Sequence, residues 1–431
     1  MIAMRKGLIS VAALLSISSL SVASPYEPAA RTPGEPYGAL TVTAKSAIVM
    51  DAASGKVLWA KDADTPRYPA STTKIMTALL LLENCKLDEM ITAPADIETV
   101  TESSLHLKPF EQISVRDMLY SLMLRSANDG AYAVASHVSG SVEAFAKLMN
   151  ARANQLGAVN TSFTNPHGLR DEKHLTTARD LALIAREAMK NPVFREVVRT
   201  PRYKISRSIN KGDELLISKN RLLRLDPTLE GIKTGFTIPA GRCYVGSATR
   251  DGYRLITVVL NSQDWQLDSE RLLEWAYANH RRIPIVKAGQ VLGRAQVSGG
   301  EDEAVAFVPL RDVDSVLPLS SIPPSANPQF VIQPLTAPIN KGQQIGTATF
   351  IEPDGFANTV PILAAADLKA STPLLAAAVS SPTVRVLAGL AIGAYVLRRR
   401  SRRRRSYARP SKSHQAPTGR QPAQRSQRRQ W

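Results

Sequence analysis

The chain has 431 residues, 44% of them apolar, and a formal net charge of +17. This length exceeds one average domain and the composition is ordinary for a globular protein, so a disordered chain is excluded and two domains with tails are expected. Thirteen lysines and arginines and no acidic residue lie from Arg398 onward, which leaves +4 of the +17 for everything before. Because the body is near neutral, a nucleic-acid-binding protein is disfavoured, and residues 398–431 are predicted to be a disordered basic tail.

Residues 1–23 are predicted to be an export signal. Arg5 and Lys6 form a positive start, an apolar stretch follows over 8–20, and Ser21-Val22-Ala23 offers a small-residue cleavage site. A proline-rich segment then argues against a continuing buried helix. We therefore expect an exported protein at the extracytoplasmic, periplasmic face of a bacterial inner membrane.

Residues 37–281 carry strand patterns at both ends and helical patterns between them. Runs at 46–51 and 56–61 flank Ala53-Ser54-Gly55 as a hairpin, and runs at 243–249 and 254–261 flank Asp251-Gly252 as another. Helices are predicted over 75–82, 114–124, 131–138, 142–156, 177–189 and 268–280. This order predicts an α+β catalytic domain in which a sheet is covered by helices.

Residues 282–370 are predicted to form a small all-β domain. Short β-like runs at 329–332, 344–351 and 359–363 alternate with Gly and Pro, and no convincing helical pattern occurs. Its composition differs clearly from that of the preceding segment, so we place the domain boundary near Arg281.

Residues 374–397 are predicted to be a membrane anchor. Val386 to Leu397 is an uninterrupted apolar run, about 18 Å of helix against a hydrocarbon core of roughly 30 Å. Extension back to Leu374 gives enough length but admits Pro382 and Arg385, so spanning and interfacial attachment both stay open. The arginines from Arg398 onward are what the positive-inside rule expects of a cytoplasmic flank.

Only two cysteines occur, Cys85 and Cys243. They could pair in an oxidising compartment, but two separate thiols are the simpler interpretation. The sequence suggests no metal site and no cofactor.

Three short motifs carry the candidate chemistry, and the first is Ser71-Thr72-Thr73-Lys74. A serine hydroxyl is a weak nucleophile until a base removes its proton. Ser71 and Lys74 are three residues apart at a predicted helix start, which places both side chains on one face, where a neutral Lys74 could accept the proton. A helix N-terminus also favours developing negative charge.

The second motif, Ser126-Ala127-Asn128, lies in a predicted turn, and the third, Lys233-Thr234-Gly235, in a predicted strand. Ser126 could relay a proton to a leaving amine, and the Asn128 amide could hold a substrate amide and orient Lys74. Lys233 and Thr234 could bind a carboxylate, while a glycine at the third position lets backbone approach a ligand closely. Each motif alone is weak, but the ordered set is specific for serine acyl transfer.

With these motifs, residues 37–370 resemble the low-molecular-mass penicillin-binding proteins that are D-alanyl-D-alanine carboxypeptidases. The segments that carry the resemblance are Pro69–Thr77, Ser126–Asp129, Asn165–Leu169, Gly231–Thr237 and Ala337–Gly342. The resemblance implies a penicillin-binding and β-lactamase-like fold followed by a β domain, removal of the terminal D-alanine from peptidoglycan stem peptides, and covalent inhibition by β-lactams.

The resemblance also implies roles for single residues. Ser71 would be the acyl nucleophile, Lys74 the proton acceptor and Ser126 the proton relay. Asn128, Lys233, Thr234, Gly235 and Thr237 would bind substrate, and the backbone N–H groups of Ser71 and Phe236 would form the oxyanion hole. His167 is interpreted as a structural histidine that could also shape the floor of the site.

Two positions depart from the family pattern. Residues 264–268 lack the arginines that relatives often have before the closing helix, and Lys219 stands where some relatives have arginine. Carboxylate binding should therefore depend on Lys233, Thr234 and Thr237, with Arg242 as a further cation.

Three rival functions share parts of this pattern. A class A serine β-lactamase needs a deacylating glutamate, yet no Glu-x-x-Leu-Asn motif occurs between Asn128 and Lys233. A D,D-endopeptidase would use the same acyl-enzyme, so the sequence does not separate it from a carboxypeptidase. A catalytically silent wall-binding protein would not need the intact motifs.

Overall fold

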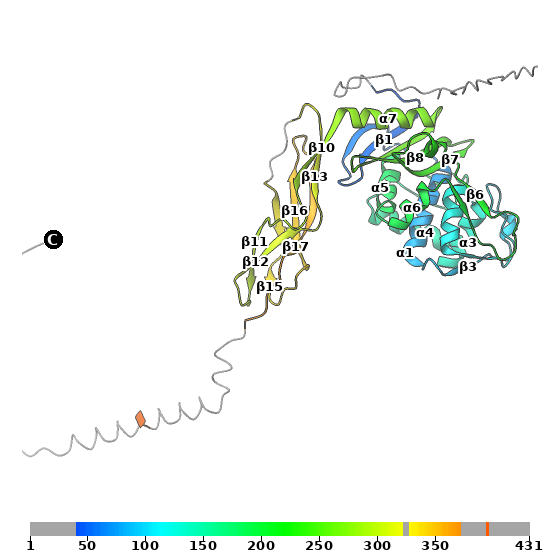
Figure 1. Ribbon diagram of the computed structural model, residues 1–431. Coiled ribbons are helices and arrows are strands. Elements are labelled where there is room, and N and C mark those ends of the chain that lie inside the picture. The colour runs from blue at the N-terminus through cyan, green and yellow to red at the C-terminus, as the bar shows by residue number, and fades with distance from the viewer. Residues whose placement is uncertain (1–39, 322–326, 372–393, 396–431) are drawn as a thin grey trace, which may run out of the picture. The chain divides into compact units, whose positions relative to one another are not determined.

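The computed structural model describes residues 40–321, 327–371 and 394–395 (Figure 1). The predicted signal peptide, nearly all of the predicted anchor over 374–397 and the basic tail lie outside the described residues. Among the residues that are described, no helix is both long and apolar enough to cross a membrane.

The first part of the fold is built on an antiparallel sheet of five strands in the order β2-β1-β9-β8-β7. The strands are β1 (Ser46–Asp51), β2 (Val57–Lys61), β7 (Leu229–Thr237), β8 (Gly241–Arg250) and β9 (Tyr253–Ser262). Both predicted hairpins are present, and the second turns at Asp251-Gly252, where both residues have positive φ. In the register, Ile48 of β1 faces Val258 of β9.

Helices cover both faces of this sheet (Figure 1). On one face, Leu272 of α7 (Trp265–Asn279) packs in a cluster with Val49 and Val259. On the other, α5 (Ala178–Ala188) belongs to the larger core with Ile48 and Val258. Since both faces are covered, β1 is buried at every position, and its central residues, Ala47 to Met50, are a continuous apolar run rather than an alternating one.

Helix α1 (Lys74–Asn84) contacts α2 (Val115–Tyr120), α3 (Asn128–Ser139), α4 (Val142–Gln155) and α5. Helix α6 (Pro192–Arg199) packs against β7. Every residue of α1 from Lys74 to Leu81 is buried. Two helices begin with a side-chain cap: the hydroxyl oxygens of Ser114 and Thr177 accept from the backbone N–H groups of Asp117 and Asp180.

Some predicted boundaries were wrong. The chain from Ala70 to Thr73 forms a 3-10 turn (η1) before α1 starts at Lys74, and the Thr72 hydroxyl donates to the Pro69 carbonyl there. The predicted helix 114–124 ends as a π turn, Ser121–Arg125 (η3), and α3 already begins at Asn128. Helix α6 and the hairpin of β5 (Arg202–Lys204) and β6 (Leu215–Ile217) were not predicted.

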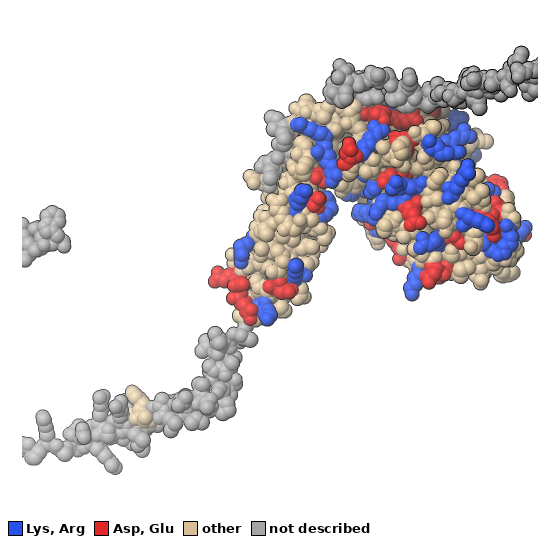
Figure 2. Space-filling model, viewed as in Figure 1, with Lys and Arg blue, Asp and Glu red and all other residues tan. Residues whose placement is uncertain are grey.

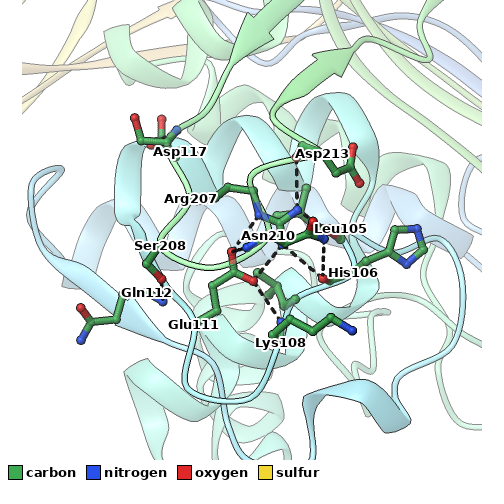
Figure 3. A network of polar contacts seen from close by, with 12 residues as sticks. Leu105, His106, Lys108, Glu111, Gln112, Asp117, Arg207, Ser208, Asn210 and Asp213 are labelled. Carbon is green, nitrogen blue, oxygen red and sulfur yellow. Dashed lines mark hydrogen bonds and ion pairs between the residues drawn. The ribbon is translucent and has the colours of Figure 1, made fainter.

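A buried polar network fixes the segment beside η3 (Figure 3). The guanidinium of Arg207, in the β5–β6 loop, donates two hydrogen bonds of 2.8 and 2.9 Å to the two carboxylate oxygens of Glu111, and both side chains are fully buried. It also donates to the carbonyls of Leu105 and His106. Because breaking a buried ion pair costs about 3–5 kcal/mol, this network strongly holds residues 104–111 in place.

The segment from His280 to Ser371 consists of strands and turns, as predicted, and has no helix among its described residues. β10 (His280–Val286) pairs with β13 (Val313–Pro318), and six more strands follow the order β14-β16-β17-β12-β11-β15. Their bounds are β11 Gly293–Ser298, β12 Ala304–Pro309, β14 Gln329–Ile332, β15 Leu335–Thr336, β16 Gln344–Ile351 and β17 Ala357–Ala364. Buried and less buried residues alternate along β12 and β17, as in a sheet with one face in a core.

The described residues form two compact units, and the division runs through this β-rich segment. The smaller unit contains Leu292–Phe307, Gln333–Ile345 and the described residues from Leu363 onward, and the larger unit contains the rest. The boundary near Arg281 between a catalytic and an all-β domain stays a prediction.

The two cysteines are separate thiols, as the simpler interpretation of the sequence had it. Cys243 is buried and Cys85 is partly buried, and neither forms a disulfide. On the face shown in Figure 2, lysine and arginine are interspersed with aspartate and glutamate over the described residues.

Candidate active site

The three motifs meet in one cleft, whose cavity volume is about 600 Å³. Ser71 enters it from η1, Ser126 from the end of η3, and Thr234 and Gly235 from β7. These segments lie far apart in the sequence, and they come together because η1 packs against β7 and β8 while α1 packs against η3 and α3. The structure therefore assembles the predicted site from the predicted elements.

Lys74 is the centre of the polar contacts in this cleft. Its Nζ lies 3.2 Å from Ser71 Oγ and donates to Asn128 Oδ1 at 2.7 Å and to the carbonyl oxygen of His167 at 2.8 Å. A neutral amine has two N–H donors and one lone pair. With both donors directed to Asn128 and His167, the lone pair is left for the Ser71 hydroxyl proton.

The surroundings of Lys74 favour this neutral form. Burial of the side chain, followed by the positive charges of Lys233 and Lys219, holds the pKa of Lys74 well below its usual range, although Asp129 acts in the opposite direction. A lysine with a lowered pKa is able to act as a general base near neutral pH. Lys74 is thus suited to the proton-acceptor role that the sequence predicted.

Asn128 and Ser126 are positioned by backbone geometry at the junction of η3 and α3. Ser126 has φ 68° and ψ 35°, the left-handed region, which costs roughly 1–2 kcal/mol for a residue with a side chain. The backbone N–H of Asn128 donates to the Ser103 carbonyl, and its Nδ2 donates to the Thr101 carbonyl. The second bond fixes the amide so that Oδ1 faces Lys74, and one Nδ2–H is left for a substrate amide.

Strand β7 supplies the third motif. Lys233 is fully buried, its Nζ donates to the Thr234 carbonyl at 2.9 Å, and burial, with a smaller effect of Lys219, lowers its pKa to about 7. A bound carboxylate would restore the charge of such an amine. Thr237, half-buried at the end of the strand, accepts from the Ala240 N–H.

Gly235 allows a close approach of backbone, as the sequence predicted, but to another segment of the chain and not to a ligand. A Cβ at this position would lie 3.0 Å from the Ser71 nitrogen and 3.2 Å from the Pro69 carbonyl oxygen. Only a residue without a Cβ lets β7 approach the nucleophile turn this closely. The close approach is therefore to the backbone of Ser71, and it brings the predicted oxyanion donors, the N–H groups of Ser71 and Phe236, onto adjacent segments.

The segment Asn165–Leu169 forms the other side of the nucleophile turn. A Cβ at Gly168, which has φ +88°, would lie 1.8 Å from the Ala70 carbonyl oxygen. His167 Nδ1 accepts from the Leu169 N–H, and burial, with the nearby charge of Lys74, lowers the pKa of His167 to about 3. The ring is thus a neutral structural group, as interpreted, whereas the His167 carbonyl holds Lys74, which the sequence did not indicate.

Three cations, Lys219, Arg221 and Arg242, line the cleft, and Lys219 Nζ donates to Ser103 Oγ at 2.8 Å. Sequence reasoning noted Lys219 and Arg242 but missed Arg221 and Ser103. No local signal marked those two, because an arginine beside a turn and a serine in a polar run are common on any surface. These cations give the cleft a positive character suited to an anionic ligand.

This fold and this site together define serine acyl-transfer enzymes with the penicillin-binding-protein fold. The described structure is similar to that of penicillin-binding protein 5 from Haemophilus influenzae, with 27% sequence identity, a TM-score of 0.62, and coverage of 77% of this chain and 99% of that chain. It is also similar to a point mutant of the Streptomyces K15 DD-transpeptidase, with 34% identity and a TM-score of 0.53 over 55% of this chain and 99% of that one.

Sequence comparisons give the family. Residues 30–264 match the model for D-alanyl-D-alanine carboxypeptidase, and residues 281–370 match that for the C-terminal domain of penicillin-binding protein 5. D-alanyl-D-alanine carboxypeptidase DacC of Escherichia coli is 33% identical over 75% of this chain and 84% of its own length. DacF of Bacillus subtilis is 29% identical over 79% and 90%. The chain belongs to the D-alanyl-D-alanine carboxypeptidase family and is a serine peptidase, which confirms the predicted family and fold class.

Proposed function

We propose that this enzyme removes the terminal D-alanine from peptidoglycan stem pentapeptides through an acyl-enzyme on Ser71. The observation that carries this proposal is the contact of Lys74 with Ser71, Asn128 and the His167 carbonyl in a buried, positively charged site. The names of the relatives, which are D-alanyl-D-alanine carboxypeptidases, support the substrate class.

Each step of the proposed reaction uses a group whose position has been described. Lys74 takes the proton of Ser71, whose Oγ attacks the carbonyl carbon of the penultimate D-alanine, and the N–H groups of Ser71 and Phe236 stabilise the oxyanion. Ser126 relays a proton to the leaving nitrogen as the C–N bond breaks and D-alanine departs. Water then hydrolyses the ester and restores Ser71.

β-lactams are proposed to acylate the same serine and to remain bound. A β-lactamase of the rival type would need a carboxylate to activate the deacylating water. The segment Asn165–Leu169, which adjoins Lys74 here, contributes a carbonyl oxygen and no carboxylate. This favours a penicillin-sensitive peptidase over a β-lactamase.

The test of substrate class is the terminal carboxylate. We expect the wild type to cleave an acyl-D-Ala-D-Ala peptide far better than its C-terminal amide. Lys233→Ala should erase most of that preference, because a charge-assisted hydrogen bond to a carboxylate contributes roughly 1.5–3 kcal/mol, or about 10- to 150-fold in kcat/KM. The measurement is kcat/KM for both peptides by release of D-alanine.

Arg242 provides the matched control, since it is an exposed cation that lines the cleft. Arg242→Ala should reduce the preference for the carboxylate by less than Lys233→Ala does. If the Lys233 variant still preferred the carboxylate peptide as strongly as the wild type does, the carboxylate would have to be bound by Arg242 or Lys219. Failure of the wild type to release D-alanine from either peptide would contradict the carboxypeptidase function itself.

We further propose that residues 1–23 direct export of the enzyme and that the apolar run within 374–397 holds it at the membrane. The catalytic domain would then lie on the periplasmic side. The sign pattern supports this: seven arginines lie within 398–405, after the apolar run and a near-neutral body. An electrostatically attached protein would leave the membrane in a high-salt or carbonate wash, and a spanning one would not.

A chain that ends after Ser371 should be released in soluble form and still bind penicillin. Ser371 is chosen because Ala370 bridges to Gly300 and the Ser371 N–H donates to the Gly299 carbonyl, so an earlier end would remove sheet contacts. Fractionation of cells that express both forms gives the comparison. Truncated protein that still sediments with membranes would place the anchor elsewhere in the chain.

A further inference from the structure

A second cluster of chemistry-bearing side chains lies outside the catalytic cleft. The Sγ of Cys85, a carboxylate oxygen of Glu89 and a ring nitrogen of His137 all lie within 4.8 Å of one another. Cys85 is the residue that ends α1, Glu89 directly precedes β3 (Met90–Thr92), and His137 is in the last turn of α3. Three segments of the fold thus contribute one donor each.

The donors are held by their local structure. His137 Nε2 and Glu89 Oε1 are 2.8 Å apart, and the second oxygen of Glu89 accepts from the Lys86 N–H at 3.2 Å. The Cys85 N–H donates to the Leu81 carbonyl, and the Glu89 carbonyl accepts from the Val115 N–H. The backbone from 85 to 89 is therefore fixed at both ends, so a bound ion would need to immobilise little further backbone.

The chemistry of this set selects the kind of ligand. A thiolate, an imidazole and a carboxylate are the three donor types that zinc prefers, and three protein donors leave one tetrahedral position for water. Calcium and magnesium would be disfavoured by the sulfur and nitrogen donors. Glu89 is exposed and the other two side chains are partly exposed, which gives an ion a path from solvent.

We propose that Cys85, Glu89 and His137 bind a zinc-class divalent metal ion, with a water molecule as the fourth ligand. On binding, the thiol proton of Cys85 passes to solvent, the contact between His137 and Glu89 opens, and each gives its lone pair to the metal. A first-row ion such as Co²⁺ would occupy the same site, because it accepts the same donors and geometry.

The position of this site suggests what the metal would do. α1 begins at Lys74 and α3 begins at Asn128, which meet at 2.7 Å in the catalytic cleft. Two of the metal ligands, Cys85 and His137, are at the opposite ends of the same two helices, and α1 has 11 residues, which is about 16 Å. The ion would join the far ends of these helices without touching the reacting groups, so its role would be structural.

Cobalt titration of the full, untagged chain, freed of metal, tests the proposal. The wild type should bind one Co²⁺ with a thiolate-to-cobalt charge-transfer band and the visible bands of tetrahedral cobalt, and Zn²⁺ should displace it. Cys85→Ser should lose the charge-transfer band. Glu89→Gln and His137→Gln should each weaken binding by more than about tenfold, a loss that even outer-shell changes cause at metal sites.

Two control variants separate this site from adventitious binding. Cys243→Ser removes the other thiol, and His106→Gln breaks the exposed pair of His106 with Glu102, whose closest atoms are 3.7 Å apart. Both should bind Co²⁺ as the wild type does. Added Zn²⁺ should raise the Tm of the wild type but not that of Cys85→Ser, and fluorescent-penicillin labelling should show that the Cys85 variant is folded. Absence of the thiolate band, or equal binding by Cys85→Ser, would overturn the proposal.

Discussion

Ser71→Ala is expected to abolish covalent labelling by fluorescent penicillin and to lower kcat for D-alanine release by roughly 10⁶-fold, the loss that removal of a serine nucleophile causes in serine hydrolases. The reason is that no acyl bond can form without Oγ, whereas the contacts of Lys74 with Asn128 and His167 remain. Labelling in a gel and intact-mass spectrometry measure the bond, and thermal unfolding shows whether the fold is retained.

Ser126→Ala is the matched control, because Ser126 is the other motif serine in the cleft. It should slow acylation by about 10²- to 10⁴-fold, as expected for loss of a proton-transfer group, but should still become labelled after long incubation. Labelling of Ser71→Ala at the wild-type rate, or a Ser126 variant that never becomes labelled, would reverse the two roles.

The second large effect is expected at Lys74. Lys74→Ala should slow acylation by about 10²- to 10⁴-fold, because the general base is lost. In the wild type, acylation should accelerate as the pH rises through the pKa of Lys74, since the neutral amine is the active form. His167 and His174, whose Nε2 is 2.8 Å from Thr73 Oγ1, have pKa values of about 3 and 4. Neither histidine therefore changes the acylation rate with pH near neutrality.

A Lys233 variant tests how the acylation rate depends on pH. Burial and then the charge of Lys233 lower the pKa of Lys74, so Lys233→Ala should raise that pKa and move the rise in acylation rate to higher pH. The measurement is the second-order rate of penicillin acylation between about pH 5 and 10, a range that spans the lowered lysine pKa values. A rate profile that does not move in Lys233→Ala would show that the charge of Lys233 does not set the pKa of Lys74. A wild-type rate that falls as the pH rises would contradict the assignment of Lys74 as the base.

The grouping of the motif side chains in one cleft was predictable because their signals are local. Ser71 and Lys74 are three residues apart, so their contact follows from helical geometry alone. The hairpin of β8 and β9 was also marked locally, by Asp251-Gly252. For Lys233, Thr234 and Gly235 a strand assignment and the order of the motifs were enough to place them with the serine.

The remaining parts depend on pairings that local patterns do not encode. Arg207 and Glu111 are 96 positions apart and form a fully buried pair, although both types are usually on the surface. The His167 group that holds Lys74 is a backbone carbonyl, which every residue has. The early start of α3 was missed for a similar reason: Ala127 offers no side-chain cap, and Asn128 and Asp129 read as turn residues.

The two glycines that border the nucleophile turn limit how this enzyme can escape from an inhibitor. A side chain at Gly168 would overlap the Ala70 carbonyl, and one at Gly235 would press on the Ser71 nitrogen. Substitutions there would shift the turn that carries Ser71, most severely at Gly168, and so impair the native reaction together with β-lactam binding. Resistant variants should therefore arise at the rim of the cleft, where the Phe236 side chain is 63% exposed, and seldom at its floor.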